Sequence, residues 1–282
     1  MYNSQLYNVG LYGSNAVLAA PAAMLSEIEF NGYSLQSTSI ITQNLRIDSM
    51  PARDLEVSRN PRTHGGIILN DSQRVKTIRL TGILKANTAA ALETLIDTFK
   101  KNISALEGNL DYNNPASVKK RHVCTLINGD SIFGRREGWN ITICPFDLTF
   151  VCYDPFGKSL TYNSTAIFGQ TSLNKNETIF VDGTYEAEGV LIFVFNSASS
   201  ITGLTFTNND RSESMSVTTA ISTGDVIIFD AETKTVTKNG VEIDYSGVFP
   251  IFSLGTNSYT VALAGGGSAN WDLTLKYLTT YL

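Results

Sequence analysis

Residues 224–263, GDVIIFDAETKTVTKNGVEIDYSGVFPIFSLGTNSYTVAL, decide the fold class because they contain several successive strands together with their turns. Val226 and Ile228 belong to a first apolar strand, and the polar run 230–234 has the length of a hairpin connection. Asn239-Gly240 follows the next strand, and this dipeptide best tolerates the positive φ of a tight reversal. Strands at such short spacing pair with their antiparallel neighbours, so this stretch predicts a β-sandwich.

The composition also favours a protein built mainly of strands. The chain has 282 residues, which exceeds the usual size of a single domain and predicts two. Its hydrophobic content of 43% fits a folded protein, and 22 glycines with many Thr, Asn and Ser favour turns and strands over helices. Residues 1–153 carry 15 Lys and Arg against 13 Asp and Glu, whereas residues 154–282 carry 6 against 13. Neither half has the basic stripe that nucleic-acid binding needs, so we expect no sequence-specific binding of this kind.

The three cysteines and the hydropathy of the chain indicate where the protein is made. Cys124, Cys144 and Cys152 are an odd set without paired spacing, so we expect reduced, mostly buried side chains and neither a disulfide framework nor a zinc site. No run of sequence approaches the ~18 apolar residues of a membrane span. The weakly apolar residues 16–24 could imitate a signal segment, but no Lys or Arg precedes them. We therefore expect synthesis in a reducing cytoplasm.

Alternating and β-branched patterns predict strands in both halves of the chain. In the first half we expect them at 28–30, 39–47, 56–59, 66–69, 76–84, 123–127, 131–136 and 140–152. In the second half we expect them at 188–195, 201–207, 215–220, 225–229, 234–238, 248–252, 259–263 and 272–277. The run YDPFGK at 153–158 marks the joint between the halves, and eight strands suit a jelly-roll or galectin-like sandwich for the second half.

One helix is predicted among the strands of the first half, at residues 88–103. Its apolar residues recur at the i, i+3, i+4 spacing that places them on one stripe: Leu92, Leu95, Ile96, Phe99 and Ile103. Asn87 or Thr88 can cap its start, while Lys100 and Lys101 suit the negative end of the helix dipole. The polar face is not strongly basic, so we expect the stripe to pack on a sheet and not on a membrane.

Residues 1–26 stand apart as an N-terminal arm. The runs LYNVG at 6–10 and LYG at 11–13 form a short echo, and the Ala-rich piece that follows carries no charge. Two alternatives stay open for this arm: a disordered tail, or a segment that packs on a neighbouring subunit. Its tyrosines and leucines make the second credible, because exposed aromatic residues commonly find a partner surface.

Four groups of motifs, taken in their order along the chain, resemble a known family. They are IEFNGYSL at 28–35, RTHGG at 62–66 with VKTIRLTGI at 75–83, FVCYDPF at 150–156, and the series of strands and turns at 224–263. They are similar to the opening strand, the mid-domain loop and strand, the domain junction and the C-terminal domain of the distal tail proteins of long-tailed bacteriophages. The resemblance covers about residues 27–282.

This resemblance implies a fold and a place in the virion. Residues 27–153 are expected to form a ring-building β-sandwich with one helix, and residues 154–282 a galectin-like β-sandwich that projects outward. It further implies a structural protein of the tail tip or baseplate, a homo-hexameric ring that joins the tail tube protein to the tail-tip hub and leaves a channel for DNA. The alternative is a carbohydrate- or receptor-binding protein of the virion, in which Trp139, Trp271 or several of the tyrosines could stack on a cell-surface saccharide, although a single tryptophan is more often part of a core.

Every enzyme template that we tried fails on spacing, so we expect no enzyme and no catalytic, cofactor-binding or metal-binding residues. Gly157-Lys158-Ser159 lacks the first glycine of a phosphate loop, because Cys152 stands at that position. His64-Gly65-Gly66 occurs without the Gly-x-Ser-x-Gly nucleophile turn of a lipase. His64 and His122 are too few for a multi-histidine metal centre.

Two charged groups remain to be interpreted. Asp225 and Asp230 bracket one strand, but five residues along a strand place their side chains on opposite faces and about 17 Å apart, too far for a glycosidase pair. We expect these carboxylates to serve turns and strand ends. The basic residues 119–121, followed by Arg135-Arg136, fit either a solvated pair of loops or strand ends or a patch for a partner.

Overall fold

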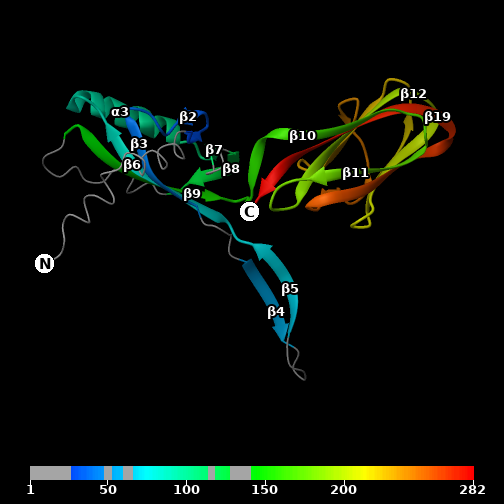
Figure 1. The fold of residues 1–282 in the computed structure, drawn as a ribbon, viewed down its shortest axis with the longest axis horizontal. Helices are drawn as coiled ribbons and strands as arrows, with labels where there is room; N and C mark the ends of the chain where they lie inside the picture. Colours follow the sequence, from blue (N-terminus) through cyan, green and yellow to red (C-terminus); the bar gives the residue numbers. More distant parts are fainter. Residues whose placement is uncertain (1–26, 48–52, 60–65, 114–117, 128–140) are drawn as a thin grey trace. The chain divides into compact units, whose positions relative to one another are not determined.

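The computed structural model describes residues 27–47, 53–59, 66–113, 118–127 and 141–282, and Figure 1 shows it as a ribbon. The chain divides into two compact units: unit 1, Met1–Gly157 with Leu282, and unit 2, Lys158–Tyr281. Antiparallel strands dominate both units, which confirms the predicted mainly-β class. Within these described ranges no helix is long and apolar enough to span a membrane. The predicted arm 1–26 and the predicted strand 131–136 lie outside the described residues.

Unit 1 is built from two antiparallel ladders that are joined through one pair of strands. Its strands are β1 (Glu29–Phe30), β2 (Tyr33–Ser34), β3 (Ile40–Ile47), β4 (Arg53–Arg59), β5 (Gly66–Gln73), β6 (Lys76–Lys85), β7 (Gly108–Asn113), β8 (Lys119–Leu126) and β9 (Ile143–Cys152). One ladder runs β3·β6·β9 and the other β2·β1·β7·β8. They join where β8 pairs with β9, while β4 and β5 form a separate hairpin.

The one helix of the described residues, α3 (Ala89–Ile103), covers one face of the β3·β6·β9 ladder (Figure 1). Thr88 caps it as predicted, since its Oγ1 accepts a hydrogen bond from the Ala91 amide at 3.2 Å. Four residues of the predicted stripe are buried: Leu92, Ile96, Phe99 and Ile103. The fifth, Leu95, is half-buried at the edge of this contact. The ring of Phe99 lies 5.1 Å from that of Phe146 on β9, so the helix and the sheet share one core.

Unit 2 is a sandwich organised around two long strands. Its strands are β10 (Gly157–Gln170), β11 (Asn174–Val181), β12 (Ala187–Asn208), β13 (Glu213–Ile221), β14 (Val226–Asp230), β15 (Thr235–Lys238), β16 (Val241–Glu242), β17 (Ser246–Gly247), β18 (Ile251–Phe252) and β19 (Gly255–Tyr281). β12 and β19 pair antiparallel along nearly their whole length. The first half of β12 also pairs with β14 and its second half with β13, so the bent ribbon belongs to both sheets.

The bend in this ribbon has a backbone cause. The register of β12 and β19 shifts between Phe195 and Ser197 and again on both sides of Ile201. Such bulges bend the strand and increase its twist. Gly265 sits at the bend with φ of 120°, and a side chain there would collide with the carbonyl of Ser200. Glycine is required because it alone tolerates both the positive φ and this close approach.

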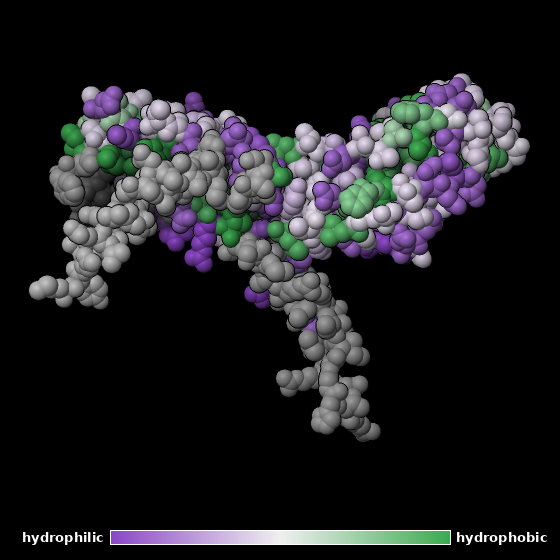
Figure 2. All heavy atoms as spheres, in the orientation of Figure 1, coloured by the Kyte–Doolittle hydropathy of each residue, from purple (hydrophilic) through white to green (hydrophobic). Residues whose placement is uncertain are grey.

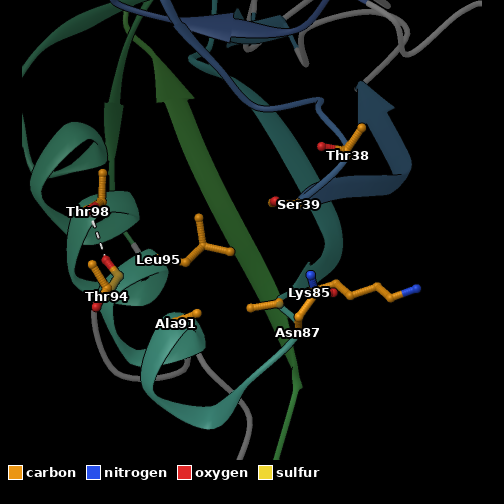
Figure 3. Close-up of a pocket in the computed structure, with 9 residues that line it drawn as sticks. Thr38, Ser39, Lys85, Asn87, Ala91, Thr94, Leu95 and Thr98 are labelled. Carbon is orange, nitrogen blue, oxygen red and sulfur yellow. Dashed lines mark hydrogen bonds between the residues drawn. The ribbon is translucent and has the colours of Figure 1, made fainter.

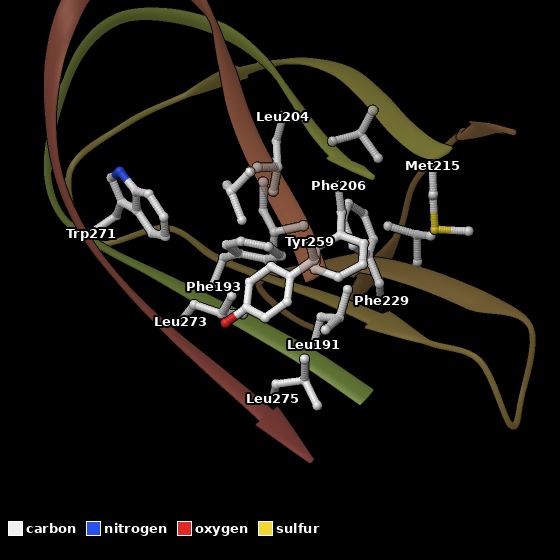
Figure 4. Close-up of a cluster of buried hydrophobic side chains, with 14 of the residues drawn as sticks. Leu191, Phe193, Leu204, Phe206, Met215, Phe229, Tyr259, Trp271, Leu273 and Leu275 are labelled. Carbon is white, nitrogen blue, oxygen red and sulfur yellow. The ribbon is translucent and has the colours of Figure 1, made fainter. Parts of the chain in front are cut away.

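The core of unit 2 lies between the two sheets of the sandwich (Figure 4). Figure 4 shows the side chains of Phe193 and Phe206 from β12, Phe229 from β14 and Tyr259 from β19 pointing toward one another. Successive residues of β12 alternate between buried and half-buried, as expected for a strand inside a sheet. These contacts place the large aromatic residues of unit 2 in its interior.

Several strands differ from the predicted ones, and each difference has a physical reason. β7, β10 and β11 were not predicted, because their Gly, Asn, Ser and Lys residues interrupt the apolar alternation. β12 and β19 were each predicted as two shorter strands, because polar and glycine residues mark the bend of the ribbon. The predicted strand at 248–252 was too long, since only the two residues of β18 lie in a strand there.

Candidate assembly surface

The face of β6, β8 and β9 that points away from α3 exposes several apolar side chains. We call it the outer face and define it by Val75, Val123, Ile127 and Tyr153 together with the smaller residues between them. These four side chains are exposed by 49%, 42%, 58% and 65%. Alternation produces this arrangement, since the buried partners in β6, β8 and β9 belong to the core under the helix.

The strand register gathers the outer face into rows. Val151 on β9 lies between Thr77 on β6 and Thr125 on β8. Thr149 on β9 pairs with Arg79 on β6, and Ile127 follows β8 and donates its amide hydrogen to the carbonyl of Thr149 at 3.0 Å. The rows combine β-branched and aromatic side chains with few charges. Such a surface can pack on another protein with little cost of removing charges from water.

Ion pairs neutralise several basic residues of this unit, one of them within the rows of the outer face. Arg79 forms an ion pair with Asp147, and its hydrogen bond lowers the pKa of that carboxyl group. On β8, Arg121 pairs with Asp111 at 2.7 Å, and the neighbouring lysine, Lys119, pairs with Glu29 at 3.2 Å. The basic residues 119–121 therefore belong to a strand and largely face carboxylates, which argues against a patch for a polyanion. Arg135-Arg136 lies outside the described residues.

A shallow groove of about 650 Å³ runs beside the first three turns of α3 (Figure 3). It is lined by Thr38, Ser39, Lys85, Ala86, Asn87, Ala91, Thr94, Leu95 and Thr98. The hydroxyl groups of Thr94 and Thr98 donate to helix carbonyls four residues earlier, at 3.1 Å and 2.8 Å. Their hydrogens are therefore already used within the helix, and the groove presents no converging set of polar groups that would select a small ligand.

The surface of unit 2 exposes several aromatic residues. Phe168 on β10 and Phe180 on β11 are exposed by 69% and 66%. In Figure 2, apolar residues reach the surface in separate groups with hydrophilic residues between them. Trp271 is fully buried, and its Nε1 donates a hydrogen bond to the carbonyl of Ser172 at 3.1 Å. It cannot stack on a saccharide, whereas Trp139 lies outside the described residues and the tyrosines Tyr162 and Tyr245 are exposed.

The other residues singled out in the sequence have structural partners. Lys158 forms an ion pair with Glu232 at 3.0 Å, and Gly157 lies against the ring of His122. His122 is buried, with its Nε2 3.2 Å from the hydroxyl of Tyr112. Among the described residues no group of three His, Cys, Asp or Glu could hold a metal ion. His64 lies outside the described residues.

Asp225 and Asp230 serve turns, as predicted. Asp230 accepts hydrogen bonds from the amides of Glu232 and Thr233 at 2.9 Å and 3.1 Å and so closes the loop between β14 and β15. Asp225 accepts from the amide of Ser222 at 2.7 Å, while Lys238 and Asn239 hold the same carboxylate from β15 and the following turn.

The carboxyl group of Asp225 has a lowered pKa. Burial alone would raise it, but the hydrogen bonds from Ser222, Lys238 and Asn239 outweigh that effect. We expect Asp225→Asn to lower the free energy of unfolding of unit 2 by about 1–2 kcal/mol at pH 7. Because the folded pKa lies below the unfolded value of about 3.9, the stabilisation is complete above that pH and is lost as the pH falls through the folded pKa.

Urea unfolding at pH 7 and near pH 3 measures this difference. The exposed Asp244 provides the matched control, since Asp244→Asn should change the free energy of unfolding by less than about 0.5 kcal/mol at either pH. An equal loss for the two variants at pH 7, or a difference that grows in acid, would show that Asp225 does not act through its charge.

The comparisons with known proteins concern the second unit most directly. Residues 182–281 match the family model described as "Siphovirus-type tail component, C-terminal domain". No curated protein matches the chain. The crystal structure of the Dit protein of phage SPP1, described as a paradigm of the hub adsorption apparatus of phages that infect Gram-positive bacteria, superimposes with a TM-score of 0.67. Its sequence is 13% identical, and the match covers 90% of this chain and 98% of that one.

Weaker matches come from the baseplate of phage p2 in its activated conformation. One chain of the strontium-bound baseplate has a TM-score of 0.44 at 11% identity, with 86% of this chain and 92% of that chain covered. The predicted resemblance to the distal tail proteins is thus confirmed by the family model for residues 182–281 and by the shared fold for most of the chain.

Proposed function

We propose that this chain, a siphovirus-type tail component whose C-terminal domain belongs to the distal tail proteins, closes into a homo-hexameric ring at the tip of the phage tail. The observation that carries the proposal is the fold, which matches that of the SPP1 Dit protein over 90% of the chain and in both units. In a ring, one face of each subunit meets a different face of the next, and rotational symmetry stops the growth.

The two units would divide the work, with residues 27–153 building the ring and residues 154–282 projecting from it. The outer face of unit 1 supports this division, because it offers exposed apolar area with few charges next to a folded core. The predicted arm 1–26 would add to assembly by packing on a neighbouring subunit. The ring would join the tail tube protein on one side to the tail-tip hub on the other and leave a central channel for DNA.

This function requires no chemistry at the protein surface. The chain would act through geometry, as a connector in the virion that is made in the host cytoplasm and assembled there. A receptor-binding protein or a cell-surface saccharide would be a further partner of the projecting unit. Of these partners, a saccharide has the weaker support, since the buried Trp271 cannot stack on a sugar.

Electron microscopy of the purified full-length protein, together with its mass in solution, tests the proposal. We expect six-fold rings with the mass of six 30.7 kDa chains and a central opening. A monomer that binds on a glycan array would support the carbohydrate-binding alternative. A monomer that binds no glycan and also fails to assemble with a tail-tube partner would contradict both functions.

The outer face gives a prediction about assembly. Replacing Ile127 and Tyr153 together by lysine should raise the dissociation constant between subunits at least about tenfold, because two charges would have to lose water in an apolar contact. The monomer should keep its stability to within about 0.5 kcal/mol for each substitution, since both side chains are largely exposed. Sedimentation across a dilution series measures the dissociation constant.

Leu106 provides the control for this prediction. It is exposed by 86% in the loop after α3, away from the rows of the outer face. Leu106→Lys should therefore leave the dissociation constant unchanged. If the double variant associates as tightly as Leu106→Lys, the ring is built through another surface of the chain.

A further inference from the structure

The two ladders of unit 1 are joined by a short seam. β6 and β9 pair through ten residue pairs, and β7 and β8 through six. β8 and β9 pair through only two, Thr125 with Val151 and Leu126 with Phe150. The connection between the ladders therefore depends on few backbone hydrogen bonds and on the side chains that lie next to them.

Cys124 and Cys152 stand opposite each other at the end of this seam. The register of β8 and β9, continued by one residue beyond Thr125 and Val151, brings these two cysteines together. Ile127 and Thr149 form a hydrogen-bonded pair at 3.0 Å, and since such pairs alternate, Cys124 and Cys152 occupy a non-hydrogen-bonded position. There the Cα atoms lie about 4.5 Å apart, within the range that a disulfide spans.

The two side chains influence each other. Both are fully buried on the core side of their strands, both are free thiols, and each shifts the pKa of the other. Cys144, the third cysteine, lies on β9 eight residues before Cys152, which is roughly 27 Å along a strand and too far to reach either. Only one intramolecular pair is therefore open to the three cysteines.

Polar groups around the pair favour a thiolate on one partner. The hydrogen bond from Cys124, with His122 and the buried Lys76, lowers the pKa of Cys152. The pKa of Cys124 is raised, first by its hydrogen bond to Cys152 and then by burial. Two thiols with separated pKa values resemble a nucleophile and a resolving partner, because the thiolate is the reactive form.

We propose that Cys124 and Cys152 form a cross-strand disulfide when a small peroxide oxidises them outside the reducing compartment in which the protein is made. The Cys152 thiolate attacks one peroxide oxygen, which breaks the O–O bond and gives a sulfenic acid and hydroxide. The Cys124 thiol then attacks this sulfur and forms the S–S bond, while the hydroxyl leaves as water. The proton that Cys152 released when it became a thiolate neutralises the hydroxide, so that two thiols and one hydrogen peroxide yield one disulfide and two waters.

The disulfide would link β8 to β9 covalently at the place where the two ladders join. It closes the chain from 124 to 152 into a loop and ties the β7·β8 ladder to the β6·β9 ladder at the point with the fewest hydrogen bonds. A loop of this length restricts the unfolded chain, so the oxidised protein should melt roughly 10 °C higher in its first unit. This inference is independent of the proposed ring, because it concerns a single chain.

Thiol counting on the full-length protein tests the proposal. The protein is treated with hydrogen peroxide, quenched with catalase, unfolded and alkylated with N-ethylmaleimide, and its peptides are identified by mass. We expect three alkylated cysteines before treatment and one afterwards, Cys144, with the other two recovered as a linked peptide pair that a reductant separates. Three alkylated cysteines after treatment, or a sulfinic acid at Cys152 without a linked pair, would overturn the proposal.

Two variants keep the test decisive. Cys144→Ala should react like the unmodified protein, because this side chain takes no part in the bond. Cys124→Ala should instead accumulate a sulfenic acid at Cys152 that dimedone traps, since the resolving thiol is gone. Linkage that persists in Cys124→Ala, or that disappears in a folded Cys144→Ala, would assign the bond to another pair and reject the proposed one.

Discussion

Replacing Trp271 by alanine is expected to lower the free energy of unfolding of unit 2 by about 3–5 kcal/mol. Trp271 is fully buried among the two sheets, with its ring 6.2 Å from that of Phe193 (Figure 4). The substitution removes this apolar surface and leaves a cavity that the surrounding strands can only partly fill. It also leaves the carbonyl of Ser172 without its 3.1 Å hydrogen bond.

Phe168 is the control for this substitution. It is an aromatic residue of the same unit but is exposed by 69%, so Phe168→Ala should cost less than about 0.5 kcal/mol. Urea unfolding followed by circular dichroism measures both values. A small loss for Trp271→Ala would mean that the indole lies at the surface, and the saccharide alternative would then regain its support.

Phe99→Ala should destabilise unit 1 by about 3–5 kcal/mol, the second large effect that we expect. Phe99 is fully buried at the centre of the contact between α3 and the sheet. Its ring lies 5.1 Å from Phe146 and 6.3 Å from Tyr33, in a tilted and an edge-on arrangement. Such aromatic pairs add to the free energy gained from burial alone, so the loss should lie in the upper part of the range.

Lys100 follows Phe99 on the exposed side of the same helix and gives the matched comparison. Lys100→Ala should cost less than about 0.5 kcal/mol, because this side chain is exposed on the surface of the helix. Thermal unfolding of the two variants measures both losses of stability. Comparable losses at positions 99 and 100 would mean that the helix presents a different face to the sheet.

Patterns among residues that are close in the sequence predicted the helix and a hairpin of this fold. The stripe of α3 and its cap at Thr88 were recognised because helical spacing and capping depend on residues close in the sequence. The hairpin at Asn239-Gly240 was recognised for the same reason, and both residues have positive φ, 53° and 80°. Leu95 was predicted to lie in the core but is half-buried. The spacing of apolar residues shows which face of a helix is buried, but it does not show how wide the buried part of that face is.

Features that depend on pairing between distant strands could not be predicted. The outer face exists only because the register sets Val151 between Thr77 and Thr125, which belong to three separate segments of sequence. The contact of Cys124 with Cys152 follows from that same register, whereas the spacing of the cysteines along the chain suggested no pair. Residues 75–83 and 147–153 each show the alternating pattern of a strand with one exposed face. This pattern does not reveal the outer face, because the outer face forms only when the strands lie side by side.

The long ribbon of β12 and β19 constrains how unit 2 is made in the cell. Phe195 pairs with Trp271, and the strands β13–β18 are translated between them. A nascent chain that has left the ribosome as far as β18 therefore exposes the inner edge of β12 and cannot complete either sheet. We expect unit 2 to fold late and slowly, within milliseconds to seconds after β19 emerges, because contacts between distant segments must form first. Until then the unpaired edge of β12 can attract other growing chains, so slow translation of the region before β19 would favour aggregation over folding.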